Sequence, residues 1–174
     1  MPSLKPCVDA IYEGVDRVSE NIPGLPRCEV TLARLLLLVG GAVLHDLEGQ
    51  LKPHGMNDSD FRALMMLFAS AEGSATPGEL CALAEQSPTN MTRIANALVK
   101  REFITRAQAV EDRRQVVLRI TPTGRRFVKK LLPTMFPAVL HAFSCFSTTE
   151  RKTLETLLKK LALHLDQTNP DERS

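Results

Sequence analysis

A chain of 174 residues can form one compact domain of ordinary size, and its 44% apolar and 24% charged residues exclude a disordered or a fibrous protein. Without tryptophan and with a single tyrosine, the composition favours a helical core of leucine, alanine and methionine. The four cysteines form no CxxC pair and have no histidine at metal-binding spacing, so we expect reduced thiols, no metal site and no other cofactor.

No secretory signal is expected, because residues 1–16 lack an apolar segment followed by a small-residue cleavage site. The longest apolar run, residues 32–44 with an interruption at Arg34, is shorter than the roughly 20 residues that cross a bilayer. We therefore expect a cytoplasmic chain without membrane contact, in which this run forms a buried helix.

The net charge of +2 is distributed unevenly along the chain. Residues 1–86 hold 6 Lys and Arg against 12 Asp and Glu, residues 87–130 hold 11 against 3, and residues 131–174 hold 5 against 5. The middle segment therefore carries a net charge of +8 and is expected to attract a polyanion, most commonly the phosphates of a nucleic acid. A solubilising basic surface without a partner is the alternative.

The first third of the chain is predicted to be helical. Proline and glycine separate an amphipathic helix over about residues 5–20 from a long helix over about residues 28–52. Asn57 is the expected N-cap of a third helix, with Asp60 at its third position. The apolar face of that helix is predicted from Phe61, Leu64, Met65 and Phe68.

Two short helices joined by a tight turn are predicted next. After a loop, "SAEGSA", the sequence "TPGEL" has the pattern of a capping box, with Thr76 as N-cap, Pro77 in the first turn and Glu79 at the third position. "SPTNM" provides a second cap from Ser87 and Pro88, so the pair forms a helix-turn-helix. The first helix is expected to pack through Leu80, Leu83 and Ala84.

The second of these helices has one polar and one apolar face. The apolar face consists of Met91, Ile94, Ala95 and Leu98, and the polar face of Thr89, Thr92, Arg93, Asn96 and Lys100. Residues 87–101 contain no acid, whereas an ordinary surface helix usually carries glutamate. Amide, hydroxyl and guanidinium donors read base edges and phosphates, so the pattern favours a helix in the DNA major groove.

A β-hairpin is predicted after the helix-turn-helix. Alternating apolar residues in 103–108 and 115–120 form its strands, and "AVEDRR" forms its tip. The tip arginines, Arg113 and Arg114, are expected to reach the neighbouring minor groove, and Asp112 could orient one of them by bidentate pairing. A solvent-exposed turn with incidental charges is the alternative.

The last third is again helical. Thr121 and Pro122 begin a helix that extends to about residue 143, in which Pro133 and Pro137 are expected to introduce bends. A capping box at "STTE" begins the final helix, whose apolar stripe consists of Leu154, Leu157, Leu158, Leu161 and Leu165. A partner subunit would bury this stripe, and packing against the long helix of residues 28–52 is the alternative.

The segment from Thr76 to Gly124, above all "EDRR" followed by "LRITPTG", resembles the MarR family of bacterial winged-helix regulators. The resemblance covers about residues 28–166, and "PTNMTRIANAL" and "FSTTE" are similar to its multidrug-efflux repressor branch. It implies a mostly α fold with a small β-hairpin wing, in a single folding unit. Residues 56–124 would form the winged helix-turn-helix, and residues 1–55 and 125–174 the dimerisation helices.

The resemblance also implies function: a homodimeric repressor that binds a pseudo-palindromic operator on double-stranded DNA and is not an enzyme. Asp112 and Arg114 match the family's wing pair, with Arg113 at the variable position between them. Ser87 suits a phosphate contact, and the groove-reading positions are Thr89, Asn90, Thr92, Arg93 and Asn96. The departures are Phe103, where a Gly-aliphatic pair is common, and a loop without the common proline.

A small aromatic acid or phenolic effector is the ligand that the resemblance implies. Gly41 in the long helix leaves room for a ligand, His45 and Arg62 could bind its carboxylate, and Met65 and Met66 could form apolar walls. Close helix packing without a ligand, and ion pairing of the charged residues, are the alternatives.

Three other functions compete with this one. A redox-sensing regulator of the same family would use Cys28, but such sensors need tyrosines nearby and the only tyrosine is Tyr12. A winged helix that contacts only proteins would bind its partner without salt dependence. An enzyme is not expected, because the four histidines lie far apart and no phosphate loop or nucleophile elbow is present.

Overall fold

The computed structural model describes residues 3–84, 86–108 and 116–168. Contacts between residues divide the chain into two compact units, residues 1–131 and residues 132–174. Helices dominate, and a small three-stranded antiparallel sheet is the only other regular structure among the described residues. The expected fold class is thus confirmed, whereas the domain boundaries expected from the sequence stay predictions.

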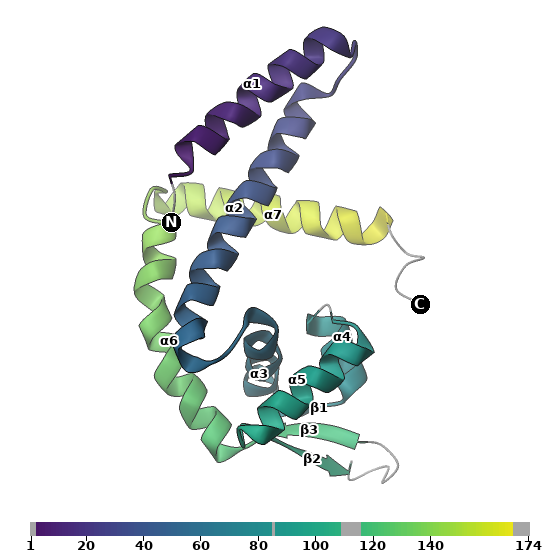
Figure 1. Cartoon of the computed structure of the whole chain (residues 1–174), viewed down its shortest axis with the longest axis vertical. Coiled ribbons are helices and arrows are strands. Elements are labelled where there is room, and N and C mark those ends of the chain that lie inside the picture. The colour runs from purple at the N-terminus through teal and green to yellow at the C-terminus, as the bar shows by residue number, and fades with distance from the viewer. Residues whose placement is uncertain (1–2, 85, 109–115, 169–174) are drawn as a thin grey trace. The chain divides into compact units, whose positions relative to one another are not determined.

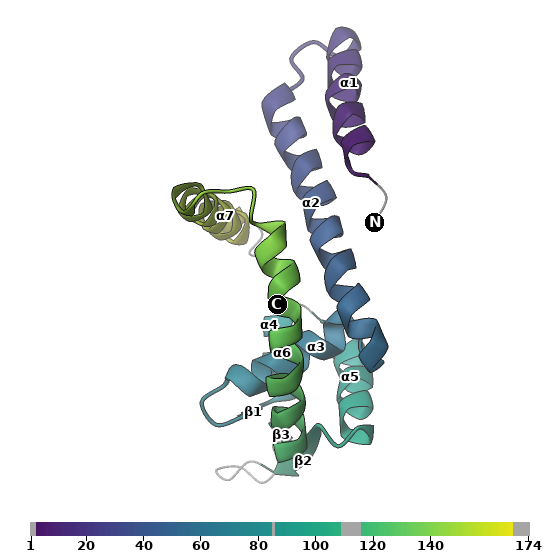
Figure 2. The ribbon, with the colours of Figure 1, turned by 90° about the vertical axis from the view of Figure 1, so that its left-hand side faces the viewer.

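The first unit begins with a helical hairpin, in which α1 (Lys5–Asn21) lies antiparallel to the first half of α2 (Arg27–Leu51), as Figure 1 and Figure 2 show. Ile11 and Val15 of α1 are buried there. A 3₁₀ turn, η1 (Lys52–His54), follows α2, and Gly55 ends it in the left-handed conformation with φ of 62°. The predicted bounds of both helices are confirmed to within two residues.

The expectation that the apolar run of α2 is buried is wrong for the single chain, since Leu51 is the only buried residue of α2. Many of its apolar residues are exposed instead, and Leu37 is 75% exposed. The helical stretch Arg27–His54 is also long enough to cross a membrane, and it contains an 18-residue window with a mean hydropathy of 1.7. Length and composition alone do not distinguish a membrane span from a helix covered by protein.

Two helices with local caps follow. Asn57 caps α3 (Asp58–Ala69) by accepting a hydrogen bond of 2.8 Å from the backbone N–H of Asp60, as predicted. The capping box of α4 (Pro77–Ala84) is also confirmed: the backbone N–H and hydroxyl of Thr76 donate to the Glu79 carboxylate at 2.7 and 2.9 Å. Leu80 and Ala84 are buried, but Leu83 is 63% exposed, so its predicted packing role within the chain is wrong.

The sheet has the strand order β1-β3-β2. The predicted hairpin is formed by β2 (Ile104–Gln108) and β3 (Val116–Ile120), with Ile104 opposite Ile120. The short strand β1 (Ser74–Ala75) pairs antiparallel with β3 and lies in a segment expected to be a loop. The core under the sheet is aliphatic, and its fully buried side chains include Leu64, Leu67, Leu80, Met91, Ile94, Leu98, Ile104, Leu118 and Val128.

Thr121 joins three elements at the base of the hairpin. Its hydroxyl donates to the carbonyl oxygen of Glu102 at 2.7 Å and accepts from the backbone N–H of Gly124 at 3.0 Å. Its backbone N–H donates to the carbonyl oxygen of Phe103 at 2.9 Å. Glu102 itself has a φ of 58°, which is unusual for a residue other than glycine.

Helix α6 (Pro122–Ala142) begins in the first unit, is continuous through Pro133 and Pro137, and ends in the second. In the second unit, Ser147 and Glu150 form the predicted capping box of α7 (Thr148–Thr168), since the backbone N–H and hydroxyl of Ser147 donate to Glu150 at 2.8 and 2.7 Å. The leucine stripe of α7 is largely exposed at Leu157, Leu158, Leu161 and Leu165.

Candidate nucleic-acid interface

Helix α5 (Pro88–Lys100) has the two faces that its sequence predicts. Ser87 caps it by accepting a hydrogen bond of 3.3 Å from the backbone N–H of Asn90. The apolar face is buried at Met91, Ile94, Ala95 and Leu98. The polar face is exposed at Thr89, Thr92, Arg93, Asn96 and Lys100. A row of hydrogen-bond donors is thereby presented to solvent by a helix that the core holds firmly.

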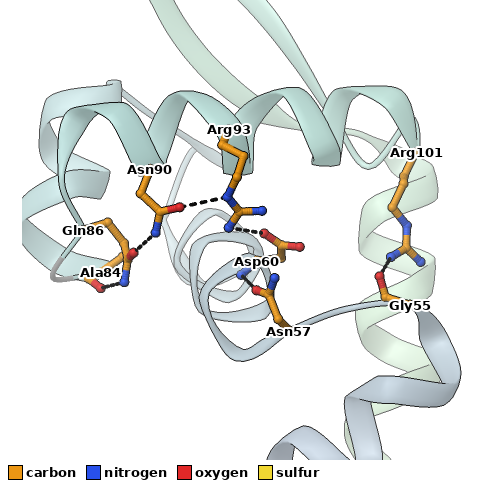
Figure 3. A network of polar contacts seen from close by, with 8 residues as sticks. All are labelled: Gly55, Asn57, Asp60, Ala84, Gln86, Asn90, Arg93 and Arg101. Atoms are coloured by element: carbon orange, nitrogen blue, oxygen red, sulfur yellow. Dashed lines mark hydrogen bonds and ion pairs between the residues drawn. The ribbon is translucent and has the colours of Figure 1, made fainter.

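Side chains at the start of α5 form a continuous polar network (Figure 3). The Gln86 amide donates to the Ala84 carbonyl at 3.0 Å and accepts from the Asn90 amide. The Asn90 carbonyl oxygen in turn accepts from Nε of Arg93 at 2.9 Å. Nη2 of Arg93 lies 3.6 Å from Oδ1 of Asp60, on α3. Both ends of the Asn90 amide are thus engaged within the protein.

Asp60 is the one charged residue buried among the described residues, with 7% of its surface exposed. Burial raises the pKa of its carboxyl group, although the nearby Arg93 and Arg101 lower it by charge attraction. The distance from Oδ1 to Arg93 is that of an ion pair without a hydrogen bond, and Oδ1 has no hydrogen-bond partner. This carboxylate therefore holds Arg93 by charge.

Arg101 ties the end of α5 to the turn between α2 and α3. Its guanidinium donates to the carbonyl oxygens of Gly55 at 2.9 Å and His54 at 2.7 Å. It also lies over the rings of Phe103, at 4.7 Å, and Phe127, at 5.7 Å. The sequence indicated only the charge of Arg101, because its partners are distant along the chain.

Arg106 contacts the exposed polar face of α5, and the sequence did not indicate this contact. It lies on β2 opposite the buried Leu118, so its side chain is on the sheet face that carries the core. From there Nη2 donates to Oδ1 of Asn96 at 2.6 Å. Strand alternation could have placed Arg106 on that face, but not its contact with α5.

Of the other predicted DNA-binding residues, the structure describes those on α5 and not those at the wing tip. Thr89 and Lys100 are exposed, and the Thr92 hydroxyl donates to the carbonyl oxygen of Pro88 at 3.0 Å. The wing-tip residues Asp112, Arg113 and Arg114 lie outside the described residues.

The predicted effector residues are not gathered in a described cavity. Gly41 and His45 are exposed on α2, and a Cβ added at Gly41 would meet nothing within 4 Å in this chain. On α3, Arg62 pairs with Asp58 at 3.0 Å, the ion-pair role that was the alternative. Met65 and Met66 are half-buried.

A cavity of about 380 Å³ lies between α1 and α2. Its lining includes Tyr12, Asp16, Arg27 and Cys28, so the structure brings the single tyrosine and Cys28 to one cavity. The described residues contain no group of three or more His, Cys, Asp or Glu side chains that could hold a metal ion.

A helix-turn-helix with donors on its second helix, followed by a hairpin wing in a segment of net charge +8, defines a winged-helix DNA-binding lobe. Residues 54–115 match the MarR family. The transcriptional repressor MprA (EmrR) of Escherichia coli K12 is 36% identical over 146 residues, which cover 84% of this chain and 83% of the relative. The chain belongs to the MarR family, whose members are DNA-binding regulators of transcription and not enzymes.

Solved structures have the same fold. A cysteine-to-serine mutant of Escherichia coli MarR complexed with operator DNA matches 82% of this chain and 96% of its own, with a TM-score of 0.68 and 24% identity. CouR of Rhodococcus jostii RHA1 bound to p-coumaroyl-CoA matches 75% of this chain and 91% of its own, with a TM-score of 0.68 and 23% identity. The winged-helix architecture expected from the sequence is therefore confirmed, and the 36% identity to MprA confirms the expected repressor branch.

Proposed function

We propose that the chain is a homodimeric transcriptional repressor that binds a pseudo-palindromic operator and releases it when a small aromatic acid or phenol binds. The observation that carries this proposal is the exposed donor face of α5, on a helix whose residues 87–101 contain no acid. Dissociation from DNA would be the regulated step, and the site of action is the cytoplasm. The 36% identity to a transcriptional repressor supports repression, as opposed to activation, of the target genes.

The contacts divide into two kinds. Arg93 and Asn96 read base edges, so truncating either should cost about 1–3 kcal/mol at particular base pairs. Lys100, and Arg113 of the wing, contact phosphates, so truncating them should weaken all sequences alike and reduce the salt dependence. Arg114 enters the minor groove in this proposal. Asn90 stays a candidate groove contact, and its amide also donates to Gln86 and accepts from Arg93.

Exposed apolar residues support the homodimer. Leu37 on α2 is 75% exposed and Leu157 on α7 is 57% exposed, and apolar faces of this kind are normally covered by protein. Leu37→Glu should therefore yield a monomer that no longer binds an operator, as light scattering after gel filtration would show. Leu83→Glu, at a comparably exposed leucine of α4, is the matched control and should leave a dimer.

The proposed effector would bind a form of the dimer whose two lobes no longer match successive major grooves. It can shift the equilibrium only by its differential affinity for the two forms. A relative crystallised with p-coumaroyl-CoA supports a phenolic ligand. Gly41, His45, Arg62, Met65 and Met66 stay the candidate contacts, and Arg62 would have to exchange Asp58 for the ligand carboxylate.

Fluorescence anisotropy with a labelled duplex from upstream of the protein's own gene tests the function. Tight, competitor-resistant binding that weakens steeply with salt, and that an aromatic acid from a panel reverses, is the expected result. Failure of a randomised duplex pool to yield any enriched site would overturn DNA binding. Salt-independent binding of a protein partner, unchanged by Arg93→Ala, would then favour a protein-interaction module.

One observation favours a second candidate, a redox-sensing regulator: Cys28 and Tyr12 line the same cavity. A hydroxyl near a thiolate can stabilise it and so promote its oxidation. This candidate predicts that peroxide abolishes DNA binding by the wild type and not by Cys28→Ser. Peroxide resistance of the wild type would eliminate it.

A further inference from the structure

Asp60 lies outside the helix-turn-helix, yet its carboxylate faces the centre of the DNA-reading helix. It occupies the first turn of α3, where Asn57 accepts a hydrogen bond from its backbone N–H, so its backbone is fixed. Its carboxylate is buried against Arg93 of α5 (Figure 3). The side chain of Arg93 is itself 53% exposed and so can reach both Asp60 and a ligand in solvent.

Two of the three guanidinium nitrogens of Arg93 are engaged by the protein. Nε donates to Asn90 at 2.9 Å and Nη2 pairs with Asp60 at 3.6 Å. These contacts come from two helices, α5 and α3, and restrict the rotamers of a long side chain that would otherwise be flexible. Nη1 and Nη2, which make no hydrogen bond to Asn90 or Asp60, remain to donate to a base. The guanidinium of Arg93 therefore has a defined orientation before DNA binds.

A buried carboxylate beside a DNA-binding surface has a second effect. It repels every phosphate in its vicinity, whatever the sequence, and low exposure reduces the screening of that repulsion by salt. Asp60 therefore weakens general attraction to DNA while it directs one guanidinium. Oδ1 of Asp60 makes no hydrogen bond and burial disfavours its charge, which opposes the stabilising effect of an acid in the first turn of α3.

We propose that Asp60 is a positioning residue for DNA recognition, which acts through Arg93 to increase the discrimination between operator and unrelated DNA. The proposal rests on the DNA-binding function proposed above. It assigns specificity to a carboxylate that does not itself contact a base. Asn90 is a second positioning residue, because its carbonyl oxygen accepts a hydrogen bond from Nε of the same guanidinium.

The test compares Asp60→Asn with wild type on two labelled duplexes, one enriched by wild type from a randomised pool and one scrambled. Asp60→Asn should bind the scrambled duplex at least as tightly as wild type, and the affinity ratio between the duplexes should fall roughly 10-fold. In an Arg93→Ala background the same change should alter the ratio less than about twofold, because the group it acts through is absent. Asn90→Ala should lose preference at the same base pairs as Arg93→Ala.

Asp58→Asn is the matched control, because it removes the same charge from the same helix turn but from a residue that pairs with Arg62. It should leave the ratio and the selected sequence unchanged. An unchanged ratio in Asp60→Asn, or an equal fall in the Arg93→Ala background, would overturn the proposal. If Asp60→Asn does not fold, a selection profile of Asn90→Ala identical to wild type would overturn it instead. Failure of wild type to enrich any duplex would refute the DNA-binding function itself.

Discussion

Gly124→Ala should destabilise the protein, although alanine is normally the better helix former. Gly124 lies in the first turn of α6, where a Cβ would overlap the carbonyl oxygen of Phe103 and come within 3.0 Å of its carbonyl carbon and of Ile120 Cγ1. That oxygen accepts a hydrogen bond from Thr121, so it cannot move away without loss. The collision is with backbone, which cannot rotate aside as a flexible side chain can.

The expected magnitude follows from opposing terms. Helix propensity favours alanine by about 1 kcal/mol. Overpacking costs about 1–3 kcal/mol, and a weakened hydrogen bond from Thr121 adds about 1 kcal/mol. The net loss in the free energy of unfolding is therefore about 1–3 kcal/mol.

Gly78→Ala is the matched control, since Gly78 also lies in the first turn of a helix that begins at a Thr-Pro pair. A Cβ there would meet only Thr76 Oγ1 at 4.0 Å, so this change should stabilise by up to about 1 kcal/mol. Urea denaturation followed by circular dichroism, at one protein concentration, measures both variants. Equal free energies of unfolding for the two variants would show that a Cβ at Gly124 does not collide with the Phe103 carbonyl.

Other predictions concern single contacts of the same lobe. Glu102→Gly should raise the free energy of unfolding by about 1 kcal/mol, because the φ of 58° is strained for glutamate and not for glycine; a loss of stability in urea denaturation would contradict this. Arg101→Met should lower the free energy of unfolding by about 1–3 kcal/mol, because the carbonyl oxygens of His54 and Gly55 lose their donor. An unchanged denaturation midpoint would show that water replaces the guanidinium as the donor. Hydrogen bonds from the N-cap threonine hold the pKa of Glu79 below its usual value of 4.5, so its contribution to stability is present above that pH and lost as the pH falls through the lowered pKa. The difference in melting temperature between wild type and Glu79→Gln should therefore shrink on acidification.

Local signals in the sequence predicted most of the fold. The caps at Asn57, Thr76 and Ser147 involve groups within four residues of one another, so their geometry follows from the local sequence. The two faces of α5 follow equally from helical periodicity. The two-residue strand β1 was missed, because only its pairing with β3 makes it a strand.

Contacts between distant segments limited the prediction of the site. The sequence indicated that Arg93 is exposed, but its pairing with Asp60 depends on how α3 packs against α5. Arg106 was overlooked for the same reason, since its partner Asn96 belongs to a different element. The apolar run of α2 predicted that the helix is covered, but periodicity does not distinguish a cover within the chain from a second subunit.

The junction at Thr121 has a mechanical consequence. Its hydroxyl and backbone bind Glu102, two residues after α5, Phe103, the residue before β2, and the first turn of α6, so the three elements are joined directly. A rotation of the first turn of α6 would therefore turn the end of α5 and the start of β2 with it.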